Sequence, residues 1–156
     1  DAQPGDPSLY LFLHDIRDPG NMGTLIRTAG AFECGAVVTL GSCVDPYNPK
    51  VLRATAGGVF AIPLVDAPWP QARKWTAEND IATVASSLEA DTRCDEADFS
   101  DRTALLIGSE AHGLPAQILT QTDVQVTIPM SADVESLNAG VAAGILLYEI
   151  YTRIRS

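Results

Sequence analysis

Three short segments carry glycine and polar residues directly after an apolar run that suits a buried strand. The first, residues 14–27, contains Asn21, Gly23 and Arg27. We expect Asn21 to cap the helix that follows, Gly23 to allow close backbone approach, and Arg27 to lie less than two turns along that helix. An arginine there can hold a phosphate through two parallel hydrogen bonds, although a surface arginine behind an ordinary helix cap leaves the same pattern.

The second segment, residues 108–115, contains Gly108 and Gly113. Two glycines so close together predict a loop whose main chain comes close to a ligand or to another part of the chain. The free N–H groups of such a loop can bind a ligand. Glu110 in this loop is a candidate base or an anchor for a cation. The alternative is a strand-to-helix turn with an exposed acid. His112 has no sequence neighbour that would orient it for catalysis, so we expect a structural or solvent-exposed role.

The third segment begins near Pro129 and leads into the last helix of the chain. Proline ends the preceding strand and leaves carbonyl groups that can accept hydrogen bonds from an exocyclic amine. We expect Ser136 to cap the last helix and Asn138 to direct its amide back toward the loop. By itself this pattern is a capped helix after a proline. Gly140 and Gly144 predict tight packing of that helix against another, within one subunit or between two.

The apolar patterns around these segments alternate between strand and helix. Runs typical of buried strands are found at residues 9–14, 36–40, 81–86, 104–107 and 124–128. Helical patterns are found at residues 21–34, 49–56, 69–79, 115–121 and 136–153, with a turn at Gly57-Gly58. This alternation predicts an α/β fold, a parallel sheet flanked by helices on both faces. Such sheets bind ligands at the carboxyl ends of their strands, where all three segments lie.

The length and composition are those of one globular domain. The chain has 156 residues, 46% of them apolar and 19% charged, and it needs neither a disulfide nor a metal to fold. Its longest apolar stretch has ten residues, whereas a membrane-spanning helix needs roughly 20. A transmembrane protein is therefore excluded. Three cysteines without a C-x-x-C pair and only two histidines predict a reducing compartment and no metal site.

The charge is distributed unevenly along the chain. The net charge of −10 would repel a phosphate backbone if it were spread evenly. Residues 1–60 hold six acids and four bases, whereas residues 61–156 hold fourteen acids and six bases. Much of the acidic excess lies between residues 78 and 101, which we interpret as a solvated face that aids solubility. We therefore expect any nucleic-acid face in the first third of the chain.

Together and in this order, the three segments resemble the motifs of the SpoU-type (TrmH-like) RNA ribose 2′-O-methyltransferases of the SPOUT class. Those motifs are N-x-G-x-x-x-R, G-x-E-x-x-G-L and I-P-M followed by S-L-N. The matching positions are Asn21, Gly23, Arg27, Gly108, Glu110, Gly113, Leu114, residues 128–130 and residues 136–138. The similarity extends over residues 9–154. Where the family more often has Val-Ser after S-L-N, this chain has Ala139-Gly140.

The resemblance implies a fold and a reaction that spacing alone does not show. The fold is an α/β domain of residues 9–156 with a C-terminal deep trefoil knot, after a linker stub at residues 1–8. The reaction transfers a methyl group from S-adenosylmethionine to a ribose 2′-hydroxyl of RNA in the cytoplasm, without a metal. Similar enzymes are homodimers through the last helix, for which Gly140 and Gly144 are suited. Members acting on ribosomal RNA commonly carry an N-terminal RNA-binding domain, which the linker-like start predicts to be absent here.

The resemblance also implies roles for individual residues. The expected catalytic residues are Asn21, Arg27, Glu110, Ser136 and Asn138. The expected cofactor-binding residues are Gly108, Ser109, Glu110, Gly113, Ile128, Met130, Ser136, Leu137 and Asn138. The expected RNA-binding residues are Arg17, Arg27, Lys50 and Arg53. We interpret Arg27 as an electrostatic clamp on the developing alkoxide and not as a base, because a guanidinium resists deprotonation.

Other functions stay open at this point. Ribosomal RNA is the favoured substrate, because the D-P-G-N-M-G run looks most like the members acting on it, and transfer RNA is the alternative. A catalytically silent RNA-binding or assembly factor would keep the same fold. A nucleotide-binding oxidoreductase is the least favoured, because no G-x-G-x-x-G follows the first strand.

Overall fold

The computed structural model describes residues 7–55 and 62–156. The described residues form six strands and five helices. The strands are β1 (Leu9–His14), β2 (Val37–Leu40), β3 (Leu64–Asp66), β4 (Ala82–Ser86), β5 (Thr103–Ile107) and β6 (Val124–Val126). The helices are α1 (Pro19–Ala31), α2 (Pro49–Thr55), α3 (Trp69–Glu78), α4 (Ala116–Gln121) and α5 (Ala139–Ile154). The predicted Gly57-Gly58 turn lies outside the described residues, as does most of the predicted linker.

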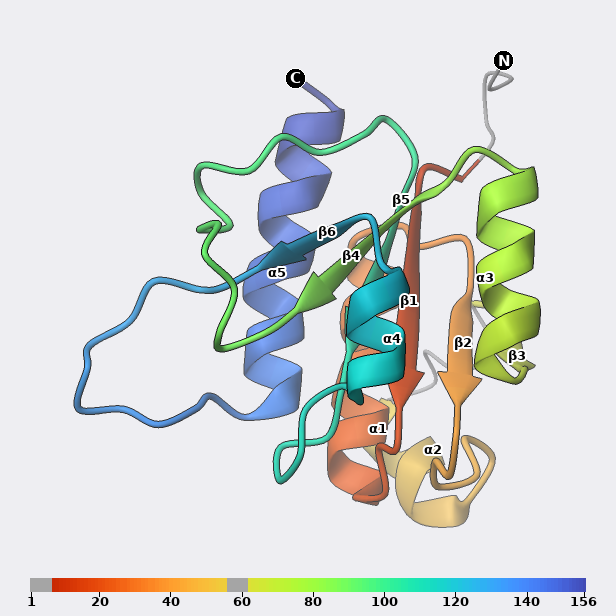
Figure 1. The fold of residues 1–156 in the computed structure, drawn as a ribbon. Coiled ribbons are helices and arrows are strands. Elements are labelled where there is room, and N and C mark those ends of the chain that lie inside the picture. Colours follow the sequence, from red (N-terminus) through yellow and green to blue (C-terminus); the bar gives the residue numbers. More distant parts are fainter. Residues whose placement is uncertain (1–6, 56–61) are drawn as a thin grey trace.

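All six strands are parallel and form one sheet in the order β3-β2-β1-β5-β4-β6 (Figure 1). The order of the strands reverses between β1 and β5, and parallel sheets bind ligands in the crevice at such a point. The register pairs Leu13 with Ile107, so the loops that follow these two strands begin side by side. The predicted parallel α/β sheet is confirmed.

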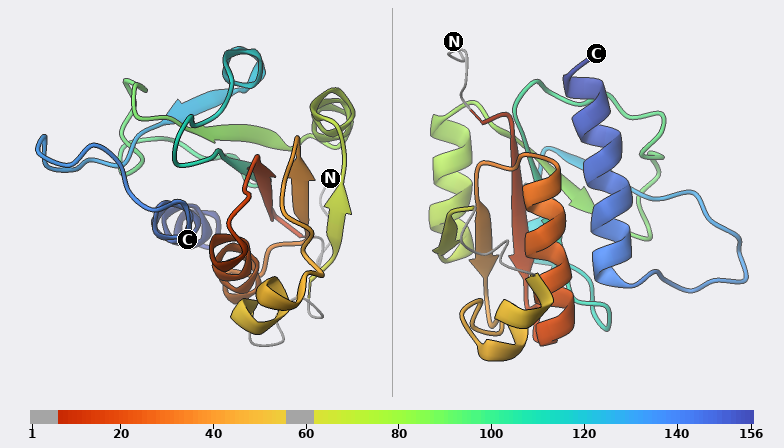
Figure 2. Two further views of the ribbon diagram at one scale, coloured as in Figure 1. Left: turned by 90° about the horizontal axis from the view of Figure 1, so that it is seen from below. Right: turned by 180° about the vertical axis from the view of Figure 1, so that it is seen from behind.

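Helices cover both faces of the sheet, with α1, α2 and α5 on one face and α3 and α4 on the other (Figure 2). The side chains of β1 alternate between the two resulting cores. Leu11 and Leu13 pack with α1 and α5, whereas Tyr10 and Phe12 pack with α3 and α4. Because both faces are buried, the strand is apolar throughout. None of the helices in residues 7–55 and 62–156 is long and apolar enough to cross a membrane.

The start of α1 differs from the prediction that Asn21 caps it. The helix begins at Pro19 and its cap is Asp18, whose Oδ1 accepts a hydrogen bond from the backbone N–H of Asn21 at 2.9 Å. Proline suits the first helical position because its φ is already helical and its missing N–H would have no partner there. Asn21 therefore lies in the first turn, which leaves its side chain available for other contacts.

The start of α5 also differs, and the prediction that Ser136 caps it is wrong. Asn138 is the cap, and its Oδ1 accepts hydrogen bonds from the backbone N–H groups of Gly140 and Val141 at 2.8 and 3.2 Å. Residues 127–138 form a long segment without helix or strand that extends away from the sheet (Figures 1 and 2). The strand predicted at residues 124–128 ends at Val126.

The edge strand β3 was not predicted. It has only three residues, it follows Pro63, and most of its surface is exposed, so it lacks the apolar run by which buried strands are recognised. Pro63 is compatible with this place because its carbonyl oxygen accepts a hydrogen bond from the backbone N–H of Val37 at 2.9 Å. The strand extends the sheet beyond β2.

Two glycines of the motif segments serve close packing between helices. A Cβ atom on Gly23 would lie 2.3 Å from the Cβ of Ala54 in α2. A Cβ atom on Gly140 would lie 3.0 Å from Cγ2 of Thr24 in α1, whereas one on Gly144 would lie 3.9 Å from Cγ2 of Thr28. The packing role of Gly140 therefore lies within the subunit, and not in the subunit contact for which it was considered suited.

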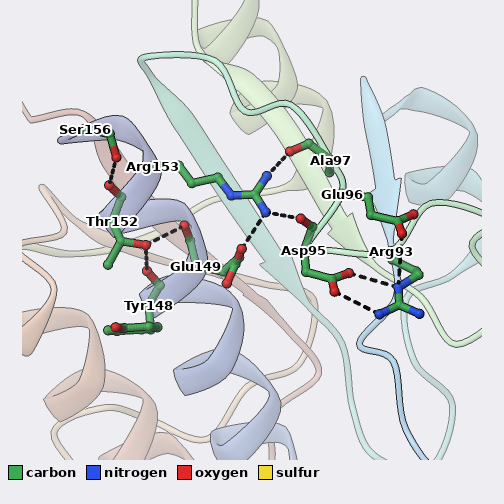
Figure 3. Close-up of polar contacts among 9 residues, drawn as sticks. All are labelled: Arg93, Asp95, Glu96, Ala97, Tyr148, Glu149, Thr152, Arg153 and Ser156. Atoms are coloured by element: carbon green, nitrogen blue, oxygen red, sulfur yellow. Dashed lines mark hydrogen bonds and ion pairs between the residues drawn. The ribbon is translucent and has the colours of Figure 1, made fainter.

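The acidic stretch after β4 is tied to α5 through Arg153 (Figure 3). The guanidinium donates hydrogen bonds to the carbonyl oxygens of Asp95 and Ala97 and to the carboxylate of Glu149. The Arg93 guanidinium donates a hydrogen bond to the Asp95 carboxylate at 2.8 Å. This bond holds the pKa of Asp95 below its ordinary value. Arg153 therefore fastens this loop to the last helix through main-chain carbonyls, while the acidic side chains of Asp95 and Glu96 remain exposed.

Candidate functional site

Side chains from all three motif segments meet in a closed triangle of hydrogen bonds. Asn21 Nδ2 donates to Glu110 Oε1 at 2.7 Å. Asn138 Nδ2 donates to Asn21 Oδ1 at 2.9 Å and to Glu110 Oε1 at 3.0 Å. The backbone N–H of Ala139 donates to the same carboxylate oxygen at 3.3 Å. Three of the predicted catalytic side chains, up to 117 positions apart in the sequence, are thus in direct contact.

Asn138 performs two tasks in this triangle because an amide offers both an acceptor and donors. Its oxygen caps α5, and its nitrogen contacts the other two side chains. Serine or aspartate caps helices equally well but brings no NH₂ group. The amide was expected to point back toward the loop that follows Pro129, but its nitrogen contacts Asn21 and the Glu110 loop instead.

The loop after β5 closes on itself and presents Glu110. Gly113 has a φ of 63°, where glycine is favoured, and its N–H donates to the carbonyl oxygen of Ser109 at 2.7 Å. A Cβ atom on Gly108 would lie 2.3 Å from the carbonyl carbon of Gly113. The close approach predicted from the two glycines is therefore an approach of the loop to itself. His112 is exposed, in agreement with the solvent role expected for it.

A cavity of about 470 Å³ lies beside this loop. Eight of the nine predicted cofactor-binding residues line it: Gly108, Ser109, Glu110, Gly113, Ile128, Met130, Ser136 and Leu137. The ninth, Asn138, lies in the triangle instead. Four further lining residues were not predicted: Ser86, which ends β4, and Ser87, Leu88 and Glu89, which follow it. Their place at the carboxyl end of a predicted strand was the signal that could have found them.

A second cavity, of about 380 Å³, shares residues 109–112 with the first. The turn between β1 and α1 forms its other wall, with Arg17 and Asn21 among the lining residues. Glu110 lines both cavities. The triangle therefore lies where a molecule in one cavity would meet a molecule in the other.

The other two predicted catalytic residues lie outside the triangle. Arg27 is exposed on α1, and Ser136 is exposed in the segment before α5. Neither side chain forms a hydrogen bond or an ion pair with any residue of the described ranges. Ser136 lines the first cavity, whereas Arg27 is in the lining of neither cavity.

The remaining predicted RNA-binding residues lie at the carboxyl edge of the sheet, where Figure 1 shows α2. Arg17 is 72% exposed, and its Nε donates to the carbonyl oxygen of Ser42 at 3.3 Å. Lys50 and Arg53 are exposed and lie about one turn apart on α2. In the described part of the chain, no group of three or more His, Cys, Asp or Glu side chains is arranged to hold a metal ion.

Comparison with known proteins identifies related sequences over most of the chain. The model of the SpoU rRNA Methylase family matches residues 8–148. The 23S rRNA (guanosine(2553)-2′-O)-methyltransferase RlmP of Bacillus subtilis is 35% identical over 140 residues, which are 90% of this chain and 56% of that protein. The 23S rRNA (uridine(2479)-2′-O)-methyltransferase of Streptomyces viridochromogenes is 37% identical over 138 residues, 84% of this chain and 48% of that protein.

The fold is also similar to that of a solved structure. The crystal structure of an AdoMet-bound rRNA methyltransferase from Sinorhizobium meliloti matches with a TM-score of 0.90 and 34% sequence identity, covering 99% of this chain and 59% of that chain. The chain spans about half the length of the two curated relatives. The family match includes all three motif segments that form the site. The chain therefore belongs to the SpoU rRNA Methylase family.

Proposed function

We propose that this chain transfers a methyl group from S-adenosylmethionine to a ribose 2′-hydroxyl of ribosomal RNA. The observation that carries the proposal is the position of Glu110, which lines both cavities and is bonded to Asn21 and Asn138. Methyl transfer requires the donor and the acceptor to meet in line across a short gap, and two cavities with a common polar wall suit that requirement. Both curated relatives are 23S rRNA 2′-O-methyltransferases, which supports ribosomal over transfer RNA.

The first cavity fits S-adenosylmethionine in size and chemistry. Its volume of about 470 Å³ lies within the range of small-molecule sites. Ile107, Leu114 and Ile128 in its lining offer apolar surface for an adenine ring, and Ser109 and Ser136 offer hydroxyl groups. When bound there, the cofactor supplies the electrophilic methyl group.

The side chains around the triangle would orient and activate the ribose hydroxyl, which is a poor nucleophile. A guanidinium keeps its proton, so Arg27 acts as a clamp that stabilises developing negative charge while the neighbouring RNA phosphate takes the proton. All hydrogen bonds that Glu110 accepts from the described residues reach Oε1. Its Oε2 is therefore left to accept a hydrogen bond from the hydroxyl, while Asn21 and Asn138 fix the plane of the carboxylate.

The domain organisation and the knot are part of the same proposal. Residues 9–156 form the catalytic domain, and residues 1–8 form a linker. A deep trefoil knot would involve the segment between β6 and α5, both ends of which contribute residues to the first cavity. A cytoplasmic location, where ribosomal RNA is made and modified in bacteria, accords with this function.

The protein also forms a homodimer through α5. Val141, Ile145 and Tyr148 are 51%, 40% and 58% exposed and follow one another at helical spacing. An apolar stripe on the surface of a helix is suited to a contact between two copies related by twofold symmetry. This stripe takes the place of Gly140 as the feature that supports a dimer.

Sedimentation velocity tests the dimer. We expect Ile145→Glu to shift the chain from dimer to monomer, because a charge would be buried without a partner. Val65→Glu places the same charge at another exposed apolar position, 46% exposed on β3, and should leave the dimer unchanged. An Ile145→Glu variant that remains dimeric would exclude α5 as the interface.

Two measurements test the reaction. Calorimetric titration of S-adenosylmethionine should show one site per subunit. Incubation with methyl-labelled cofactor and unmodified transcripts of ribosomal or transfer RNA should label a 2′-O-methylnucleoside in the ribosomal transcript. Labelling of transfer RNA alone would reassign the substrate, and cofactor binding without transfer to either RNA would favour the silent RNA-binding factor. Binding of NADH in place of S-adenosylmethionine would favour the oxidoreductase.

A further inference from the structure

An exposed aromatic residue at the carboxyl edge of the sheet takes no part in the proposed reaction. Tyr47 is 57% exposed and lies in the connection between β2 and α2. That connection lies at the carboxyl edge of the sheet (Figure 1), as do the loops after β1 and β5, which contribute lining residues to the second cavity. A single exposed aromatic side chain is ordinary on a protein surface, so its surroundings decide whether it has a function.

The ring of Tyr47 differs from other exposed aromatic rings in having no aromatic partner. Trp75 packs edge-on against Tyr10 at 5.1 Å between ring centroids, and Tyr148 packs against Phe32 at 6.2 Å. Within residues 7–55 and 62–156, the Tyr47 ring has no aromatic or cation–π partner. More than half of the residue is exposed, and no aromatic or cationic group of these residues stacks on its ring.

The turn that carries Tyr47 is held by local hydrogen bonds. Asp45 Oδ1 accepts from the Tyr47 backbone N–H at 2.9 Å, and the Asp45 carbonyl accepts from the Asn48 N–H at 3.0 Å. Asn48 Oδ1 in turn accepts from the Lys50 N–H at 2.9 Å, at the start of α2. A ring on a constrained backbone loses less conformational entropy on binding.

The same connection is bonded to the wall of the second cavity. The backbone N–H of Val44 donates to the carbonyl oxygen of Ile16 at 2.8 Å, and Arg17 donates to Ser42. Ile16 and Arg17 both line that cavity. The Tyr47 turn and the cavity wall thus form one connected unit.

The charges in this region suit a nucleic-acid strand. Arg17, Lys50 and Arg53 are exposed. Arg17 lies 3.9 Å from the carboxylate of Asp15, whereas neither Lys50 nor Arg53 forms an ion pair with a described residue. Unpaired cations can contact phosphates, and an aromatic ring beside them can stack on a base. Bases within a duplex are already stacked, whereas an unpaired base can offer a free face.

We propose that Tyr47 is a stacking platform for an unpaired RNA base near the nucleotide to be methylated, while Arg17, Lys50 and Arg53 contact the adjoining phosphates. The proposal rests on the proposed function, because that function makes RNA the ligand. Beyond that function, the proposal places the target in a single-stranded stretch of RNA. The stacking should tolerate any base, since every base has a π face.

Fluorescence anisotropy tests this proposal by measuring the affinity for a labelled oligoadenylate of about twelve nucleotides. The oligonucleotide is used both as a single strand and as a duplex with oligouridylate, with S-adenosylhomocysteine present. We expect Tyr47→Ala to weaken single-strand binding about tenfold, Tyr47→Phe to keep it, and neither variant to change duplex binding appreciably. Trp75→Ala, which removes an exposed ring elsewhere, should bind single strands like the unaltered chain. Circular dichroism should show that each variant is folded.

Unchanged single-strand binding by folded Tyr47→Ala would overturn the proposal, as would an equal loss on both RNA forms or a failure of the unaltered chain to bind the single strand. A Tyr47→Ala variant with unchanged RNA binding but an altered sedimentation coefficient would assign the ring to a protein contact. Failure of the proposed function has a different signature, because the unaltered chain would then transfer no methyl group to any transcript.

Discussion

The two halves of the candidate site differ in the contacts they make within the chain. Asn21, Glu110 and Asn138 are joined by hydrogen bonds of 2.7 to 3.0 Å. Arg27 and Ser136 are exposed and form no polar contact with the described residues. The bonded half is completed when the chain folds, whereas the open half requires a ligand. We infer that the first half positions the reacting groups and the second half binds them.

This difference separates the expected effects of substitution. Removing a member of the triangle breaks hydrogen bonds within the folded chain, so it should lower stability as well as activity, although modestly, because Glu110 and Asn138 are exposed and water can replace the lost partner. Removing an exposed group should leave the folded chain intact and affect ligand binding or the reaction alone.

The largest expected effect is the loss of methyl transfer in the Arg27→Ala variant. Loss of a preorganised group that stabilises developing charge costs about 10²- to 10³-fold in rate. The melting temperature and the affinity for S-adenosylmethionine should stay close to those of the unaltered chain, because Arg27 forms no polar contact with the described residues. Single-turnover transfer and calorimetry measure the two quantities. Arg27→Lys keeps the charge but loses the planar fork, so its transfer rate should fall between those of Arg27→Ala and the unaltered chain.

An equal loss of cofactor affinity in Arg27→Ala would assign this arginine to the cofactor and place it outside the reaction. A lower melting temperature would show that the side chain has structural contacts. Either result would break the division between a bonded half and an open half.

The next effect is the loss of stability in Glu110→Ala. This substitution removes the acceptor of Asn21 Nδ2 and of the Ala139 N–H, and we expect the free energy of unfolding to fall by about 0.5–1.5 kcal/mol, because water can reach these groups. Glu110→Gln retains one carbonyl acceptor and should lose less. Urea unfolding of both variants measures the difference. A Glu110→Ala variant as stable as the unaltered chain would show that the triangle does not stabilise the fold.

The fold could be predicted where the local patterns were unambiguous. The apolar runs before His14 and Gly108 marked the central strands, and the residue types after them marked the site. The helix starts were misplaced because two segments each offer two caps: Asp18 and Asn21 in one, Ser136 and Asn138 in the other. Local preference does not choose between neighbouring caps when the choice depends on contacts with distant loops.

The rest of the site depends on residues brought together by topology. Leu88 and Glu89 line the first cavity but have no distinctive motif around them. They reach the cavity because β4 lies next to β5 in the sheet. Likewise, the triangle requires contacts between positions 89 and 117 residues apart, and no local pattern specifies such contacts. The predicted parallel sheet placed all three segments at one edge, whereas only the resemblance to a family implied that Asn21, Glu110 and Asn138 act together there.

A smaller effect is expected for Ser136→Ala. The loss of one hydrogen bond to the cofactor should weaken its binding about two- to tenfold. The free energy of unfolding should change by less than about 0.5 kcal/mol, because the hydroxyl is exposed. Ser131→Ala is the matched control, since Ser131 is exposed in the same segment but is not in the cavity lining. If calorimetry finds the same affinity for both variants, Ser136 is not a cofactor ligand.

The smallest effect concerns a bonded group away from the two cavities. Asp123 Oδ2 accepts hydrogen bonds from the backbone N–H and the hydroxyl of Thr83 at 2.8 and 2.9 Å, and its other oxygen lies 3.1 Å from Arg73. Burial raises the pKa of Asp123, but the bonds from Thr83 and the charge of Arg73 outweigh burial and lower that pKa below its ordinary value. Asp123→Asn should therefore reduce stability without changing transfer.

The contribution of Asp123 to stability should depend on pH in a defined direction. Because the pKa of Asp123 is lower in the folded chain, the carboxylate stabilises the fold above its unfolded pKa of about 3.9, and this contribution is lost as the pH falls through the folded value. Its side chain is 41% exposed, so solvent screening should hold the ion-pair part of the effect below about 1 kcal/mol. The stability difference between the unaltered chain and Asp123→Asn should stay constant from neutral pH down to about 5 and shrink in acid. Thermal melts across this range measure it, and a difference that grows in acid would show that the carboxylate is not stabilised by these bonds.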